Sequence, residues 1–301
     1  VAQTLQGRAA GVSVINGGSP GEKTAVRIRG LGTFGDGDPL YVIDGVFTNS
    51  LNNIDPNSIK KIDVLKDAAA ASIYGSRASN GVVIITTNRG AIGKTTFQVS
   101  SYIGSQSSNK RYDVLNTSQY VQYIKEINAQ TDGGGTTINV VNDDPNFDGN
   151  GVETDWQDEF FRNAGMSNIS FNASGGTEKS TFSFGASTFS QEGVYTDTKF
   201  NRHTFNANSQ FNVTNKFRVG ETVSLGFTDR VAPQLSDGRE PLFNLLASAP
   251  YTRVRNPDGS FSGSTDADNN NSRNQLRVQD SDDNLTRNTT IIGSLYGEYD
   301  I

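Results

Sequence analysis

Five side chains that carry oxygen fall at the spacing of a calcium-binding loop between residues 144 and 155. They are Asp144, Asn146, Asp148, Asn150 and Asp155. Gly149 stands where such a loop turns sharply, and calcium takes about six to eight oxygen ligands. Gly151 replaces the usual apolar residue, and Asp155 is shorter than the usual bidentate glutamate. These residues predict a calcium site or, alternatively, a polar loop tip without metal.

Two glycine-containing motifs suggest nucleotide binding but lack the helix that this chemistry requires. Residues 30–35 match the dinucleotide pattern G-x-G-x-x-G, yet an acidic loop and another strand follow them. Residues 93–95 read Gly-Lys-Thr, as at the end of a phosphate-binding loop, but Asn88 stands where the first glycine belongs. Because a helix N-terminus is needed to hold phosphate, we expect no nucleotide cofactor.

The residues needed for nucleophilic or metal-assisted catalysis are nearly missing from the sequence. His203 is the only histidine and there is no cysteine, so a zinc site or a Ser-His-Asp triad would depend on one side chain. Carboxylates are numerous, but no pair is singled out as in a glycosidase. We therefore expect a protein that is not an enzyme.

Residues 59–90 have the pattern of a strand, a short helix and a second strand. Ile62 and Val64 alternate with charged residues, which is typical of a strand. Asp67 stands at an N-cap position before four alanines, and Gly75 follows the last apolar residue of the predicted helix. Residues 82–87 are mostly β-branched, as in a buried strand.

The same signals extend over the first 90 residues. Strands are expected at 12–15, 24–29, 40–43, 61–65 and 82–87, with helices at 4–9 and 68–74 and a helical turn at 56–59. Asp55 is the expected cap of that turn. Residues 1–90 are thus predicted to form one small α+β domain, and residues 91–301 a domain of another kind.

Beyond Gly90, apolar residues alternate with polar ones in six runs of about ten residues, which is typical of transmembrane barrel strands. The runs are 97–103, 169–175, 182–188, 205–213, 217–227 and 291–299. A soluble β-sandwich is the alternative, although its strands are usually only about 5–6 residues long. Six strands are too few to close a barrel. Glu221 interrupts the apolar phase of the fifth run.

The connections between these runs alternate in length. Residues 176–179 and 214–216 are short, whereas 107–166, 192–201 and 230–286 are long. Bacterial barrels have short periplasmic turns and long extracellular loops, so we expect the long connections outside. The first domain should then join the barrel from the periplasmic side. Within 107–166, helical spacing predicts an amphipathic helix at 112–128 and a second helix at 155–161 docked on it.

Composition excludes some classes of partner. The net charge is −6 and no basic stripe is present, so we expect no nucleic acid to bind. Mean hydropathy is −0.49, and no run of apolar residues reaches the about 18 needed for a membrane helix. No signal peptide precedes Val1, and we expect this chain to be a fragment that lacks both ends of its protein.

The motifs of the whole chain together resemble one family. In order they are LQGRAAGV at 5–12, VRIRG at 26–30, PLYVIDGV at 39–46, DVLKD at 63–67, NGVVIITT at 80–87, TDWQD at 154–158, SGG at 174–176 and QEG at 191–193. This progression resembles the plug domain and first barrel strands of TonB-dependent outer-membrane transporters. The residues within these motifs resemble those of the SusC/RagA branch, which is found in Bacteroidota.

The resemblance implies a function and a set of partners. It implies energy-coupled import of glycans or oligopeptides across the bacterial outer membrane, with a plug filling a barrel of about 22 strands. A SusD-like surface lipoprotein would cover the extracellular loops, and TonB–ExbB–ExbD would pull on a segment N-terminal to the plug that this chain lacks. Arg27, Arg29 and Arg77 are expected to contact the barrel wall. Two alternatives are a SusC-like scaffold that does not transport and a soluble carbohydrate-binding module.

Overall fold

The computed structural model describes residues 11–15, 17–28, 37–67, 72–130, 149–233, 241–262, 274–281 and 284–301. Several expectations lie outside these residues. They are the helix at 4–9, the loop at 30–35, most of the predicted helix at 68–74, Arg29 and three of the predicted calcium ligands, Asp144, Asn146 and Asp148.

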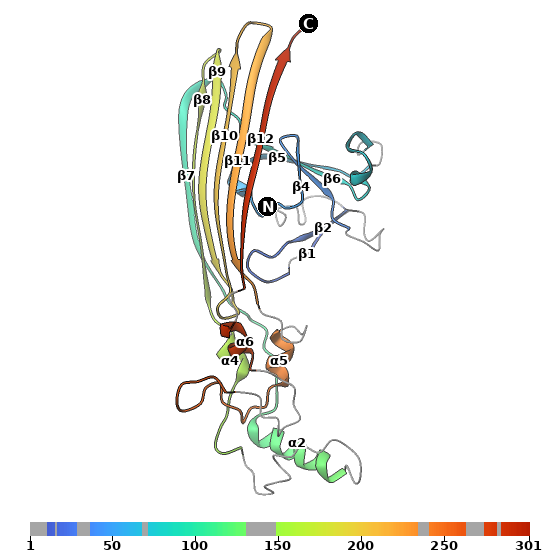
Figure 1. The fold of residues 1–301 in the computed structure, drawn as a ribbon, viewed down its shortest axis with the longest axis vertical. Coiled ribbons are helices and arrows are strands. Elements are labelled where there is room, and N and C mark those ends of the chain that lie inside the picture. Colours follow the sequence, from blue (N-terminus) through green and yellow to red (C-terminus); the bar gives the residue numbers. More distant parts are fainter. Residues whose placement is uncertain are drawn as a thin grey trace.

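Residues beyond 90 build a tall, curved antiparallel sheet, here called the wall (Figure 1). Its strand order is β12-β11-β10-β9-β8-β7, so each strand pairs with its neighbour in sequence. The strands are β7 (Gly93–Gln106), β8 (Ala164–Gly176), β9 (Ser180–Glu192), β10 (Lys199–Asn212), β11 (Phe217–Val231) and β12 (Leu285–Tyr299). The six predicted runs are confirmed except at Val213, which follows the end of β10, and the strands are 13–15 residues long.

The two faces of the wall differ in polarity. On the inner face, Ser170, Ser187 and Thr204 follow one another across three paired strands and are buried. On the outer face, the Phe171 ring stacks on Phe97, with ring centroids 6.2 Å apart, and both side chains are exposed. The sheet is therefore polar toward the inside and apolar toward the outside, as the period of two predicts.

Glu221 lies on the outer face, among apolar neighbours. It pairs in register with Ser209 and Leu295, and the Ser209 hydroxyl donates to its carboxylate at 3.1 Å. Glu221 is the fifth residue of β11 and so lies near the short turn that precedes that strand. This position near a rim, together with the bond to Ser209, accounts for a charge on an apolar face.

Residues up to 90 are here called the plug, and those that the structure describes form two small sheets. The first is the hairpin of β1 (Val12–Ile15) and β2 (Ala25–Ile28), and the second has the order β4-β3-β6-β5. Its strands are β3 (Leu40–Ile43), β4 (Val46–Thr48), β5 (Ile59–Leu65) and β6 (Val82–Thr87). The sequence did not predict β4. All the other predicted plug strands are present, with boundaries shifted by two residues at most.

Short helical turns connect the plug strands. The 3₁₀ turn η2 (Pro56–Ser58) is capped as predicted, because the Asp55 carboxylate accepts from the Asn57 backbone N–H. In the predicted helix at 68–74, the described part is the 3₁₀ turn η3 (Ser72–Tyr74) rather than an α-helix, and η4 (Ser76–Ala78) follows it. Gly75 has φ +73°, which ends the first turn and favours glycine.

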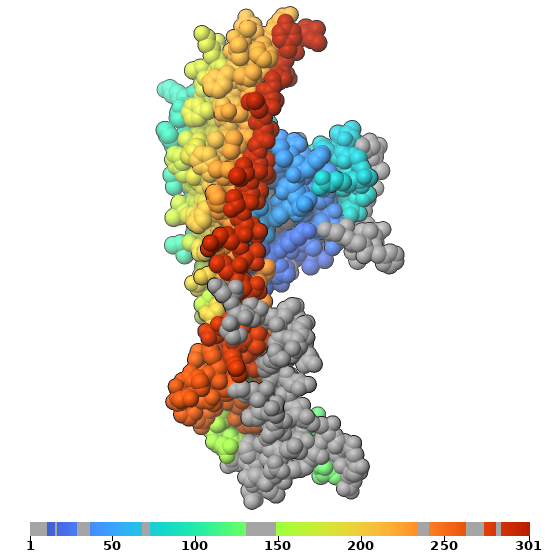
Figure 2. Space-filling view, viewed as in Figure 1, coloured from blue at the N-terminus to red at the C-terminus, as the bar shows by residue number. Residues whose placement is uncertain are grey.

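The plug has its own apolar core. Val26, Ile28, Val83 and Ile85 of β2 and β6 are buried together with residues of β1 and β3. Ile292 of the wall packs against the same cluster. Figure 2 shows the plug lying directly against the wall on the side of β12, in agreement with the contact of β12 with β4.

All three long connections lie at one end of the wall, and the short turns lie at the other (Figure 1). The plug joins β7 at the short-turn end, because Gly93 pairs with Gly176. The relative placement of plug and connections therefore agrees with the sequence analysis. Of the long connections, the one between β9 and β10 is reduced to residues 193–198.

The described residues at the long-connection end include the helices α2 (Thr117–Gln130), α4 (Trp156–Phe160), α5 (Pro241–Ala247) and α6 (Gln275–Ser281). The sequence predicted α2 and α4 but not α5 or α6. α4, expected to dock on α2, instead buries Trp156 and Phe160 against Leu245 of α5. Throughout the described part of the chain, no helix is long and apolar enough to cross a membrane.

Candidate functional site: the contact between plug and wall

Hydrogen bonds from the plug reach several strands of the wall. The Asn53 amide donates to the Thr290 hydroxyl of β12 at 2.6 Å, and the Asn57 amide donates to the Ser170 hydroxyl of β8 at 3.1 Å. The Asn208 amide of β10 donates to the backbone carbonyl of plug residue Asn88 at 2.7 Å. The polar inner face of the wall thus provides partners for polar groups of the plug.

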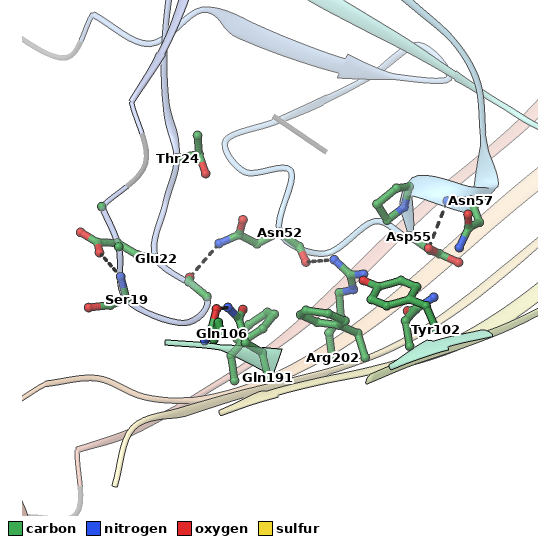
Figure 3. Close-up of a pocket in the computed structure, with 17 residues that line it drawn as sticks. Ser19, Glu22, Thr24, Asn52, Asp55, Asn57, Tyr102, Gln106, Gln191 and Arg202 are labelled. Atoms are coloured by element: carbon green, nitrogen blue, oxygen red, sulfur yellow. Dashed lines mark hydrogen bonds between the residues drawn. The ribbon is translucent and has the colours of Figure 1, made fainter. Parts of the chain in front are cut away.

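Two arginines of the wall bind two loops of the plug. Arg230 Nε donates to the Pro20 carbonyl at 2.8 Å, and Arg202 Nη1 donates to the Asn52 carbonyl at 3.4 Å. The Asn52 amide in turn donates to the Gly21 carbonyl at 2.9 Å. We call these five residues the clasp, because they connect β11, the turn at 19–22, the loop around Asn52 and β10. Figure 3 shows the bond between Arg202 and Asn52.

Gly21 allows the plug turn at 19–22 to lie close against the wall. Its φ is +62°, and a Cβ placed there would overlap the ring of Phe200, which is buried. Gly18, in the same turn, has φ +88° but faces open space. Of these two glycines, Gly21 is the one at which both the backbone conformation and the close approach of a wall side chain require glycine.

A cavity of about 400 Å³ lies between the clasp and the inner face of the wall (Figure 3). The guanidinium of Arg202 points into it and lies over the Phe189 ring, 5.2 Å from its centroid. Asp55, Tyr102 and Asn168 also line it. The cavity therefore brings charged, amide and aromatic groups together between two separate parts of the protein.

A second cavity, of about 570 Å³, lies toward the long connections. Lys110, Tyr195 and Arg230 line it, together with Gly17, Gly18, Ser19 and Glu22, which also line the first cavity. The plug turn at 17–22 consequently borders both cavities. A movement of this turn would change the space on both of its sides.

Comparison with known proteins identifies the family. Residues 1–82 match the TonB-dependent Receptor Plug Domain. TonB-dependent receptor P26 of Formosa agariphila is 31% identical over 99% of this chain and 30% of its own length. TonB-dependent receptor SusC of Bacteroides thetaiotaomicron is 35% identical over 72% of this chain and 22% of its own length. The chain belongs to the SusC/RagA type of TonB-dependent receptor.

The fold of this receptor agrees with that assignment. A solved structure of the RagAB peptide transporter superposes with a TM-score of 0.71 and 26% identity, covering 87% of this chain and 33% of that one. Another, of the RagAB peptide importer in an open-open state, gives a TM-score of 0.68. The receptor chain thus spans about a third or less of the length of the proteins it matches.

The receptor arginines expected to reach the wall have other partners. Arg27 forms an ion pair with Asp38 at 2.6 Å, and Arg77 donates to Asn49 at 3.3 Å, so both bind within the plug. The arginines that join the two parts belong to the wall instead. The sequence does indicate that Arg202 faces the inside of the wall, because this residue falls on the polar phase of its strand.

The predicted calcium ligands are only partly described. Asn150 has φ +55° and follows Gly149, and the Asp155 carboxylate caps α4 by accepting from the N–H groups of Gln157 and Asp158 at 2.9 and 3.2 Å. Across the described ranges, no cluster of three or more His, Cys, Asp or Glu side chains could hold a metal ion. The calcium site remains a prediction.

His203 lies on the outer face of the wall. Its Nδ1 is 3.0 Å from the Thr188 hydroxyl of the neighbouring strand. The only histidine of the sequence is thus an exposed residue of the wall that contacts the neighbouring strand.

Proposed function

We propose that the protein containing this chain imports glycans or oligopeptides across the outer membrane of a Bacteroidota-type bacterium, driven by TonB. The observation that carries the proposal is a folded plug hydrogen-bonded to the polar inner face of a barrel wall. In this proposal the apolar outer face contacts lipid, and the long connections face outside.

The need for an energy source follows from the contact between plug and wall. A barrel wide enough for an oligomeric substrate would leak unless a plug filled it. Each hydrogen bond that holds the plug contributes about 0.5–1.5 kcal/mol net, and the described contacts extend to β8, β10, β11 and β12. Moving the plug breaks several of them together. We propose that TonB–ExbB–ExbD supplies this work through a segment N-terminal to the plug.

The long-connection end is the proposed docking surface for a SusD-like lipoprotein. Apolar side chains are exposed there on and near α2 and α5: Tyr112, Val114, Leu115, Tyr123 and Phe243. Exposed apolar groups gathered at one end of a protein often mark an interaction site. A lipoprotein lid over this end would enclose substrate above the plug.

Uptake measurements in the source bacterium test the proposal. We expect deletion of the gene to abolish uptake of one labelled glycan or oligopeptide, and deletion of TonB to abolish it equally while the receptor remains in the membrane. A strain without the receptor that still imports every tested oligomer, but loses other outer-membrane proteins, would support the scaffold alternative instead.

A further inference from the structure

Two side chains that line the cavity beside the clasp each carry a buried polar atom without a partner. In the part of the chain that the structure describes, neither Nε of Arg202 nor Oδ1 of Asn168 makes a hydrogen bond. Arg202 is 7% exposed and Asn168 is 3% exposed. Buried polar groups are nearly always satisfied, so a small rotation of these two side chains toward the cavity would let an occupant pair with one donor and one acceptor.

The rest of the lining favours a polyhydroxylated occupant. Amides of Asn57, Gln106 and Gln191 and the rings of Tyr102 and Phe200 surround the same space. No Val, Leu, Ile or Met is among the described residues that line it. The cavity therefore offers hydrogen bonds and flat aromatic surfaces but no aliphatic pocket for the side chains of a peptide.

The charges of the cavity argue against an anionic ligand. Its charged lining residues are Arg202, Asp55 and Glu22, one cation against two carboxylates. Arg202 lies near Asp55, and the Glu22 carboxylate accepts from the Ser19 N–H at 3.2 Å. A further carboxylate would thus meet a site that already carries excess negative charge. A hydroxyl group both donates and accepts without adding charge.

We propose that this cavity is a subsite for a neutral sugar unit of an oligosaccharide, held by Arg202 and Asn168. The inference rests on the proposed function, which brings substrate to the space between plug and wall, and it selects glycans over oligopeptides. The volume of about 400 Å³ lies within the range of small-molecule sites. Because the clasp closes one side, a bound sugar would touch both the plug and the wall.

Calorimetry on the natural protein in detergent tests the subsite. The neutral probes are maltotriose, cellotriose and mannotriose, and the comparison probes are trigalacturonic acid and trialanine. We expect at least one neutral trisaccharide to bind, and its affinity to fall about tenfold or more in Asn168→Leu and in Arg202→Met. The control Asn206→Leu changes another inner-face asparagine that bonds to Ser224 and lies outside the cavity lining. It should leave the affinity unchanged.

Three results would overturn the subsite. They are no binding of any neutral probe, sugar binding that both cavity variants leave intact, and Asn168-dependent binding of trialanine or trigalacturonic acid in place of sugar. Arg202→Met could also loosen the plug, which would be seen as faster amide exchange at residues 17–28. In that case the affinity of Asn168→Leu for the sugar alone decides whether the subsite exists. Binding is measured without TonB or uptake, so a negative result here leaves the proposed transport function standing.

Discussion

Replacing Gly21 with alanine should release the plug turn from the wall. The left-handed backbone conformation at φ +62° costs an alanine about 1–2 kcal/mol. The new Cβ would also overlap the buried Phe200 ring, and overpacking of this kind costs about 1–3 kcal/mol. The sum is about 2–5 kcal/mol against the docked state of the turn.

The matched control is Gly18→Ala in the same turn. Gly18 has φ +88°, but a Cβ added there would meet no other atom, so this variant carries only the backbone cost of about 1–2 kcal/mol. Amide hydrogen exchange of the peptide covering residues 17–28 reports the opening of the turn. We expect the opening constant of Gly21→Ala to exceed that of Gly18→Ala by about 5- to 150-fold.

A second substitution separates the two costs. In a Phe200→Ala background the overlap disappears, and Gly21→Ala should then open the turn no more than Gly18→Ala does. Equal exchange of the two glycine variants in the presence of Phe200 would refute the reasoning, because the contact of the turn with the wall would then contribute nothing.

Three further predictions follow from the sequence and the fold. Residues 1–90 expressed alone should give a soluble product with a dispersed NMR spectrum, because the plug has its own core; an unfolded product would contradict the predicted domain boundary. In the cysteine-free chain, Asp258→Cys should react with an impermeant reagent on intact cells and Glu178→Cys should not, and the reverse pattern would invert the proposed topology. Calorimetry should detect calcium binding that Asp144→Ala with Asp148→Ala removes; equal uptake by the double variant would rule this loop out.

The strands of the wall could be predicted because the two sides of the sheet have different surroundings. An apolar outer face and a polar inner face impose a period of two, which Phe205 and Ala207 display directly against Asn206 and Asn208. The strands are longer than the apolar runs because backbone pairing continues into polar residues, as at Gly93 and Gln106 in β7.

Features that depend on tertiary contact could not be predicted. The strand β4 has three residues and exists because it pairs with β3. α5 has seven residues, and its helical conformation is supported by the packing of Leu245 on Trp156 and Phe160. For the clasp, the polar phase of β10 indicates that Arg202 faces inward, but its carbonyl partner 150 residues away leaves no pattern in the sequence.

A disulfide between plug and wall tests most directly whether the plug must move during import. A Cβ at Gly226 of β11 would lie 3.0 Å from the Cβ of Asn53, and a disulfide joins Cβ atoms about 3.5–4.5 Å apart, so a small shift accommodates it. The control pair, Ser187→Cys with Thr204→Cys, joins two neighbouring strands within the wall.

Under oxidising conditions we expect Asn53→Cys with Gly226→Cys to abolish substrate uptake, and a reductant to restore it. The control pair should import normally in both conditions. Uptake that continues at the normal rate while the plug is covalently fixed to the wall would contradict the account.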